Sequence, residues 1–276
     1  MTLSPEVAAA AALARKARAH AVRMVSRAKA SHIGTCLSMA DMLGALYGGG
    51  VLRVRPEEPK WPERDRFILS KGHGAAILYA VLAERGFISV SELDRYCGPG
   101  SRLLGHASHH VPGIELSTGS LGHGLPVACG MALAAAREGL DHRVYVILSD
   151  GELDEGSNWE AILFAVHHRL SNLTVLVDSN KIQSFGRVSE VLELEPLRDK
   201  WDAFRWNTIP VDGHDHGKLL EALEAAKAVT DKPTVLLCDT VKGKGVSFME
   251  DALAWHYKSP SAEQVEQALA ELGVDA

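Results

Sequence analysis

Residues 144–152 read Val-Tyr-Val-Ile-Leu-Ser-Asp-Gly-Glu, an apolar run that ends in a short acidic turn. Residues 173–180 read Leu-Thr-Val-Leu-Val-Asp-Ser-Asn, and a helix-like stretch over 157–168 separates the two runs. Strand, helix and strand make a crossover unit, so we expect the two strands to lie parallel in one sheet. The pattern therefore predicts that Asp150 and Asn180 emerge together at the carboxyl edge of that sheet, where open α/β folds bind ligands.

The two polar residues at these strand ends indicate a site for a metal ion. Asp150 and Asn180 offer the hard oxygen atoms that Mg²⁺ and Ca²⁺ prefer, and Mg²⁺ usually completes its octahedron with phosphate oxygens and water. The sequence therefore predicts a metal–diphosphate site. An aspartate before a glycine at a strand end can also cap the next helix, so Asp150 taken alone would favour capping.

Further strand-like and helix-like stretches alternate along the chain. We expect strands at 67–69, 208–211 and 234–238, and helices at 5–30, 74–85, 125–138 and 218–228. This alternation predicts a single α/β domain over 1–276, with a doubly wound, mostly parallel sheet and helices on both faces. Ser38, with Asp41 three positions later, is typical of a helix start. Residues 261–276 are expected to form a C-terminal helical appendage.

Composition narrows the class of protein. The formal charge of −6 gives no support to nucleic-acid binding, where a basic stripe is expected. No apolar run approaches the roughly 20 residues that span a bilayer, and the first residues lack the features of a signal peptide. We therefore expect a cytoplasmic protein without membrane contact. The four cysteines form no Cys-x-x-Cys pair, so neither a zinc site nor a disulfide framework is predicted.

Several segments resemble motifs of the transketolase family. Residues 149–152, followed by Asn180, resemble its thiamine diphosphate signature, Gly-Asp-Gly and a later Asn. Residues 65–74, Asp-Arg-Phe-Ile-Leu-Ser-Lys-Gly-His-Gly, match another family segment almost letter for letter. Further segments follow in the family's order: Ser-His-Ile-Gly at 31–34, Gly-His at 105–106, Ser-Thr-Gly-Ser-Leu-Gly-His-Gly at 117–124, Lys-Gly-Lys-Gly at 242–245 and Trp-His at 255–256. The departures are Ser149, where the family has glycine, and Ser31 and Ile33, where it has glycine and proline.

The resemblance implies the thiamine diphosphate-binding fold and a cofactor, thiamine diphosphate, anchored through Mg²⁺, with Ca²⁺ or Mn²⁺ as substitutes. It implies that Asp150, Asn180 and the backbone carbonyl of Ile182 hold the metal. Lys242 lies on a segment that resembles one near the diphosphate, although a solvated lysine is an equal alternative. The residues expected at the cofactor are His73, Gly119, Ser120, Leu121, Ser149, Asp150, Gly151, Glu152, Asn180, Ile182, Lys242 and His256.

Four histidines fall on family motifs and are the expected catalytic residues. An imidazole exchanges protons near neutrality because its unperturbed pKa is ~6.5. The resemblance implies that His256 and His32 take a proton from the ketose hydroxyl and return one to the acceptor aldehyde. It further implies that His106 binds the donor's terminal hydroxyl and that His73 contacts the diphosphate and the reacting centre.

The chain ends just past the point where the family's first domain ends. We therefore expect the N-terminal, diphosphate-binding subunit of a split transketolase, which transfers a two-carbon ketol unit between sugars or sugar phosphates. The pyrimidine-binding and C-terminal domains are expected on a partner subunit, in a heterotetramer that is active only as a pair. Alternatives are the α-type subunit of a 2-oxoacid dehydrogenase, a 1-deoxyxylulose-phosphate-synthase-like enzyme, and a non-catalytic protein that binds thiamine diphosphate. The sequence leaves the ketose donor, the aldose acceptor and the pathway open.

Overall fold

The computed structural model describes residues 3–274, and its centre is a five-stranded sheet in the order β1-β2-β3-β5-β4. Every neighbouring pair of strands in this sheet is parallel, which confirms the predicted α/β fold. The strands span Arg66–Leu69 (β1), Val144–Ser149 (β2), Leu173–Ser179 (β3), Asn207–Asp212 (β4) and Thr234–Asp239 (β5).

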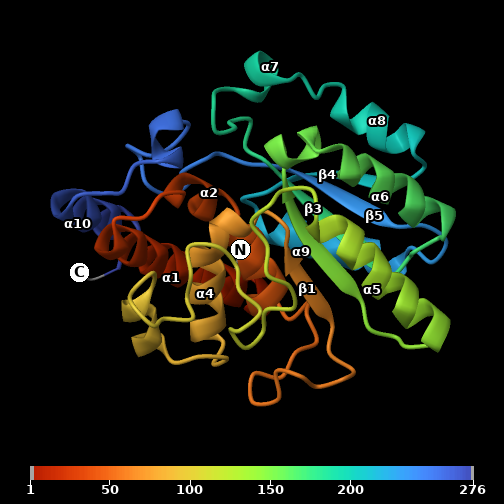
Figure 1. Cartoon of the computed structure of the whole chain (residues 1–276), viewed down its shortest axis with the longest axis horizontal. Helices are drawn as coiled ribbons and strands as arrows, with labels where there is room; N and C mark the ends of the chain where they lie inside the picture. The colour runs from red at the N-terminus through yellow and green to blue at the C-terminus, as the bar shows by residue number, and fades with distance from the viewer. Residues whose placement is uncertain (1–2, 275–276) are drawn as a thin grey trace.

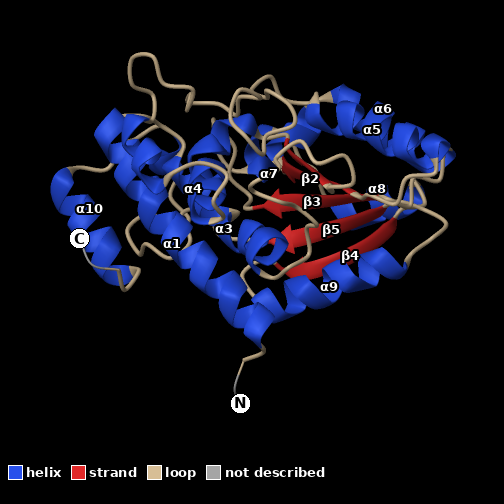
Figure 2. Cartoon of the chain, turned by 90° about the horizontal axis from the view of Figure 1, so that it is seen from below, coloured by secondary structure: helices blue, strands red, loops and turns tan. Residues whose placement is uncertain are grey.

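Helices cover both faces of the sheet, as a doubly wound fold requires. Successive side chains of a strand point to opposite faces. Along β2, Tyr145 and Ile147 therefore enter one apolar cluster, whereas Val146 and Leu148 enter the other. In Figure 2, α9 lies below the strands and α5 and α6 lie above them. The first cluster includes residues of α1 (Pro5–Ala28), α4 (Ala75–Glu84) and α9 (His216–Ala228), and the second includes residues of α5 (Gly124–Glu138), α6 (Gly156–His167) and α8 (Leu197–Ala203).

The C-terminal helix α10 (Ala262–Glu271) forms where the sequence predicts it. Its buried residues Ala268 and Leu269 join the apolar cluster that contains α1, and Arg15 of α1 donates a hydrogen bond to the carbonyl oxygen of Gly273 (2.8 Å). Figure 1 shows α10 beside α1, away from the sheet. The helix is thus packed onto the body of the protein through its apolar face. The last two residues of the predicted appendage lie outside the described residues.

The prediction that Ser38 starts a helix is wrong. Ser38 is the last residue of α2 (Ile33–Ser38), and the next helix, α3 (Ala40–Leu43), begins after Met39. The Ser38 side chain is fully buried, and its hydroxyl lies 2.6 Å from Oδ2 of Asp178. A buried hydroxyl needs a hydrogen-bond partner, and this one finds it in the sheet instead of capping a helix.

The remaining elements are short. Among the described residues, no helix has the length and apolar composition to cross a membrane. The short elements are the π-helical turn Gly44–Gly48, the 3₁₀ helices Gly72–Gly74, Val90–Arg95, Gly151–Asp154 and Leu253–His256, and the α-helix α7 (Val188–Val191).

The carboxyl ends of β2, β3 and β5 lie side by side. Ser149 is paired with Asp178 across β2 and β3, and Ser179 is paired with Asp239 across β3 and β5. The segments that follow these strands carry Asp150, Asn180 and Lys242, so the topology brings three predicted site residues to one edge of the sheet.

Candidate active site

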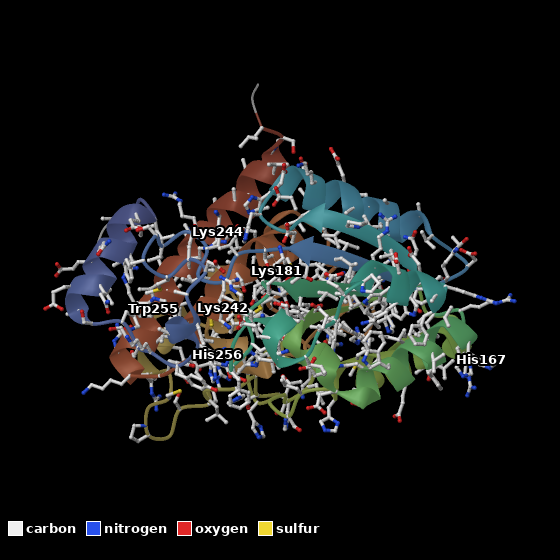
Figure 3. The ribbon with its side chains drawn as sticks, turned by 90° about the horizontal axis from the view of Figure 1, so that it is seen from above. His167, Lys181, Lys242, Lys244, Trp255 and His256 are labelled. Atoms are coloured by element: carbon white, nitrogen blue, oxygen red, sulfur yellow. The ribbon has the colours of Figure 1, made fainter. Side chains whose placement is uncertain are left out.

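A cavity of about 250 Å³ opens at this edge of the sheet. Its lining includes residues from each of the segments that resemble transketolase motifs. Figure 3 shows two of them, Lys242 and His256, close together beside the ends of the strands. The predicted residues that line the cavity are His32, His73, His106, Gly119, Leu121, Ser149, Asp150, Gly151, Asn180, Ile182, Lys242 and His256.

Asp150 and Asn180 present their oxygen atoms on adjacent loops. The Asp150 carboxylate accepts hydrogen bonds from the amide of Gly151 (2.8 Å) and from the amide of Lys181 (2.5 Å). Asn180 Oδ1 accepts from the amide of Ile182 at 3.2 Å. The capping role foreseen for Asp150 is therefore present, since its side chain caps the 3₁₀ turn at Gly151. Each carboxylate oxygen still has a further lone pair for a metal ion.

The electrostatics at Asp150 favour a cation. Burial, together with the nearby charge of Asp178, raises the pKa of Asp150 to about 6. A buried carboxylate with a raised pKa gains a large stabilisation when a positive charge comes beside it. The donor set of carboxylate, carboxamide and backbone carbonyl oxygens suits Mg²⁺ or Ca²⁺. The residues present therefore fit a divalent cation.

Lys242 is buried against the third predicted metal ligand. Its ammonium nitrogen lies 2.9 Å from the carbonyl oxygen of Ile182 and 2.9 Å from Nδ1 of His256. The side chain is 1% exposed, so the alternative of a solvated lysine is wrong. Burial and the neighbouring charge of Lys71 lower the pKa of Lys242 to about 8. The Ile182 carbonyl oxygen has two lone pairs, so it can accept from Lys242 and keep one lone pair for a metal ion.

The four motif histidines converge on the cavity. The ring centroid of His32 lies 5.1 Å from that of His73, 5.2 Å from that of His256 and 6.0 Å from that of His106. His32 has a left-handed backbone (φ 73°) at the start of α2, and its amide donates to the carbonyl oxygen of His256 (2.8 Å). This bond joins two motifs that are far apart in the sequence, and the replacements at Ser31 and Ile33 do not prevent it.

Burial keeps three of these imidazoles, those of His32, His73 and His256, neutral. It lowers the pKa of His32 to about 4, with help from the charges of His106 and Lys242. It lowers the pKa of His256 to about 3, with help from Lys242 and His32, and it holds the pKa of His73 well below its ordinary value. At neutral pH these three rings are therefore uncharged, and each has a ring nitrogen with a lone pair that carries no proton.

Two residues expected at the cofactor, Glu152 and Ser120, do not line the cavity. Glu152 is fully buried, and its carboxylate accepts from Ser70 Oγ (2.5 Å), from the amide of Gly122 (3.0 Å) and from the amide of Ser149 (3.3 Å). Glu152 thus forms hydrogen bonds within its own motif segment, 149–152, and to the segments 65–74 and 117–124. Ser120 is exposed on the loop beyond Gly119. The Ser149 hydroxyl, absent from the family motif, accepts from the amide of Glu152 at 3.2 Å.

A buried ion pair that the sequence did not predict lies beneath the cavity. Lys71 and Asp178 are both fully buried, and the Lys71 ammonium contacts the Asp178 carboxylate. Asn180 Nδ2 also donates to Asp178, at 3.2 Å, so the pair supports a predicted metal ligand. Burial alone would raise the pKa of Asp178. The charge of Lys71 and the hydrogen bonds that the Asp178 carboxylate accepts hold this pKa below its ordinary value. An aspartate within an apolar strand was the available signal, because a buried charge needs a partner.

Known proteins share both the sequence and this fold. The family described as "Transketolase, thiamine diphosphate binding domain" matches residues 9–276. An apulose-4-phosphate transketolase subunit of Phocaeicola vulgatus is 43% identical over 257 residues, which cover 93% of this chain and 91% of that protein. A 6-deoxy-6-sulfo-D-fructose transketolase subunit of Clostridium sp. (strain MSTE9) is 44% identical over 242 residues, 87% of this chain and 88% of that protein.

Solved transketolases match the structure as well. The enzyme from Leishmania mexicana superposes with a TM-score of 0.91 at 34% identity, over 96% of this chain and 41% of that one. The enzyme from Campylobacter jejuni superposes with a TM-score of 0.91 at 31% identity, over 100% of this chain and 44% of that one. The chain thus spans about two fifths of these solved enzymes. It belongs to the transketolase family and corresponds to the family's thiamine diphosphate-binding domain.

Proposed function

We propose that this chain is the N-terminal subunit of a split transketolase, which transfers a two-carbon ketol unit from a ketose to an aldose. The observation that carries the proposal is the meeting of four histidines, three of them neutral, with Asp150 and Asn180 around one cavity. One wall can anchor a metal–diphosphate and the other can exchange protons. The relatives described above are named transketolases, which favours ketol transfer over the 2-oxoacid dehydrogenase alternative.

The cofactor site proposed here consists of Asp150, Asn180 and the Ile182 carbonyl as metal ligands, with the Gly151 amide beside the diphosphate. A Cβ atom at Gly151 would come within 3.1 Å of the Gln183 side chain, which lines the same cavity, so glycine avoids crowding at this point. When bound, thiamine diphosphate supplies an electron sink for cleavage of the ketose carbon–carbon bond.

The histidines of this chain move and hold protons around that site. His256 and His32 are neutral and so can take the proton from the ketose hydroxyl. Because the Lys242 charge disfavours the protonated ring, the proton returns readily to the acceptor aldehyde. We assign His106 to the terminal hydroxyl of the donor and His73 to the diphosphate and the reacting centre.

A partner subunit is part of the proposal. Both relatives described above are named as single subunits of a transketolase, which implies a further subunit in each of those enzymes. For this chain we propose a partner that carries the pyrimidine-binding and C-terminal domains, in a cytoplasmic heterotetramer of two chains of each kind. Light scattering of the co-expressed pair measures this state, and an active complex of one chain with one partner would refute it.

The names of the same relatives support a proposal for the substrate class. The two relatives are named for a sugar phosphate and a sulfonated sugar, both of which carry an anionic group. We propose a sugar or sugar phosphate substrate here. The test is a panel of ketose donors and aldose acceptors, assayed with the reconstituted pair, Mg²⁺ and thiamine diphosphate. Ketol transfer that requires both subunits is expected. A cofactor-loaded pair that transfers no ketol unit, or turnover by this chain alone, would overturn the proposal.

A further inference from the structure

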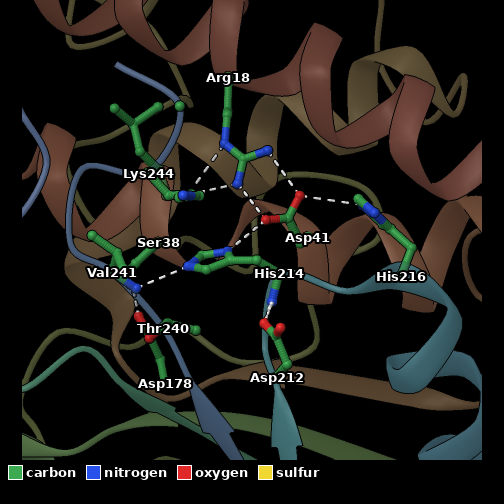
Figure 4. A network of polar contacts seen from close by, with 12 residues as sticks. Arg18, Ser38, Asp41, Asp178, Asp212, His214, His216, Thr240, Val241 and Lys244 are labelled. Carbon is green, nitrogen blue, oxygen red and sulfur yellow. Dashed lines mark hydrogen bonds and ion pairs between the residues drawn. The ribbon is translucent and has the colours of Figure 1, made fainter. Parts of the chain in front are cut away.

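A buried carboxylate, Asp41 on α3, lies outside the cavity and binds three basic side chains. Arg18 of α1 pairs with it through two bonds, Nη1 to Oδ1 (2.8 Å) and Nη2 to Oδ2 (2.5 Å). His214 Nδ1 lies 2.7 Å from Oδ2 and His216 Nε2 lies 3.2 Å from Oδ1. Figure 4 shows the arginine and the two imidazoles meeting at this carboxylate. Burial alone would raise the pKa of Asp41, but Arg18 and the histidines hold it well below its ordinary value.

The hydrogen bonds of His214 define its tautomer. Its Nε2 accepts from the amide of Val241 at 2.8 Å, so Nε2 carries no proton in this arrangement. The proton of the neutral ring is then on Nδ1, which donates to Asp41. Val241 lies two positions beyond Asp239, the last paired residue of β5, and its amide makes no bond to a neighbouring strand. A main-chain amide without a ladder partner needs another acceptor, and His214 supplies it.

The residues on either side of Val241 reach the functional site. The Thr240 hydroxyl donates to the Asp178 carboxylate, which also binds Asn180. Lys242 lies with its ammonium against the Ile182 carbonyl and His256. The Val241 amide therefore fixes the main chain between two side chains that support the metal–diphosphate region.

We propose that His214 is a positioning residue: held by Asp41 and Arg18, it fixes the Val241 amide and thereby keeps Lys242 beside Ile182 and His256. The inference rests on the proposed function, because the consequence for the enzyme is tighter binding of thiamine diphosphate, whose anionic diphosphate the Lys242 ammonium attracts. Arg18 and Asp41 act through His214, and none of the three lines the cavity.

Two matched variants separate this role from a general structural one. In His214→Asn, the amide nitrogen replaces Nδ1 and can still donate to Asp41, but nothing replaces Nε2. In His214→Gln, the longer side chain places its oxygen near the position of Nε2, where it can accept from Val241. If His214 acted only by satisfying Asp41, the asparagine variant would be the milder one.

The first readout is hydrogen exchange of the Val241 amide, measured by NMR on the full chain alone. One hydrogen bond contributes about 1 kcal/mol, so His214→Asn should speed exchange about five- to tenfold, whereas His214→Gln should remain within about twofold of the wild type. The second readout is the dissociation constant of thiamine diphosphate with Mg²⁺, measured by calorimetry on the reconstituted pair. His214→Asn should weaken it by a similar factor and His214→Gln should not.

Equal behaviour of the two variants, or retained protection in His214→Asn, would overturn the proposal. If a variant does not fold, ¹⁵N NMR of the wild-type chain decides: a proton on Nδ1 and a coupling between Nε2 and the Val241 amide are expected, and a proton on Nε2 would refute the arrangement. A wild-type pair that binds no cofactor would instead count against the proposed function, while the exchange comparison would still test the positioning of Val241.

Discussion

The ammonium of Lys71 pairs with the carboxylate of Asp178 beneath the cavity, and neither side chain has any exposed surface. Asp178 also receives the hydroxyls of Ser38 and Thr240 and the amide nitrogen of Asn180. One carboxylate thus links α2, the 65–74 motif, β3 and the segment after β5. This network supports the ends of the strands on which the predicted metal ligands lie.

Breaking this pair should destabilise the chain strongly. Lys71→Met would leave the Asp178 carboxylate buried without its main counter-charge, and such losses cost about 3–5 kcal/mol. Urea unfolding of the chain measures the change. The control is Lys181→Met, which removes an exposed ion pair with Asp239 and should cost less than about 1 kcal/mol. Equal effects of the two substitutions would contradict the role given to the buried pair.

Loss of the Asp150 carboxylate should abolish binding of thiamine diphosphate that depends on Mg²⁺. Asp150→Ala removes a predicted metal ligand that lines the cavity. Calorimetry on the reconstituted pair, with and without Mg²⁺, measures the affinity. Asp154→Asn is the matched control, because Asp154 lies on the same turn but binds Gln183. An affinity for the cofactor that survives Asp150→Ala would rule out the ligand assignment.

The motifs predicted much of this site because parallel strands end at a common edge. Asp150 and Asn180 meet for that reason, and the alternation of strands and helices predicted the α/β class. The sequence did not reveal that Lys71 binds Asp178 or that His214 binds Asp41. Those pairs join segments far apart in the chain, and their contacts depend on how helices pack on the sheet. Ser38 precedes a helix-like run and so resembles a cap in the sequence, but its hydroxyl is buried in the folded chain and binds Asp178.

Cofactor affinity should fall as the pH drops below about 6. The pKa of Asp150 is raised to about 6, so a proton competes with the metal below that pH. The ligand-free chain should show the opposite sign. The carboxyl group binds its proton more tightly when folded than when unfolded, so its contribution to the free energy of unfolding falls as the pH rises from about 4 to about 6.

Calorimetry at pH 5 to 8 measures the first effect, and urea unfolding of the wild type and Asp150→Asn between about pH 4 and pH 7 measures the second. We expect the cofactor affinity of the wild-type pair to drop about tenfold per pH unit below the pKa of Asp150. The free energy of unfolding of the wild type, relative to that of Asp150→Asn, should fall as the pH rises from about 4 to about 6. An affinity that is constant between pH 5 and 7 would show that Asp150 does not titrate with the metal site.

Removal of the His256 imidazole should lower turnover far more than it lowers stability. His256 lines the cavity, and a general acid–base group contributes about 10²–10⁴-fold to the rate. His256→Ala should therefore reduce kcat by roughly that factor in the reconstituted pair. His167→Ala is the control, since His167 is exposed on α6, and Figure 3 shows it far from His256. Because burial keeps the pKa of His256 near 3, the pH profile of kcat/KM should show no loss of activity near the ordinary imidazole value that depends on this residue. An acid limb near that value that disappears in His256→Ala would contradict the neutral state assigned to the ring.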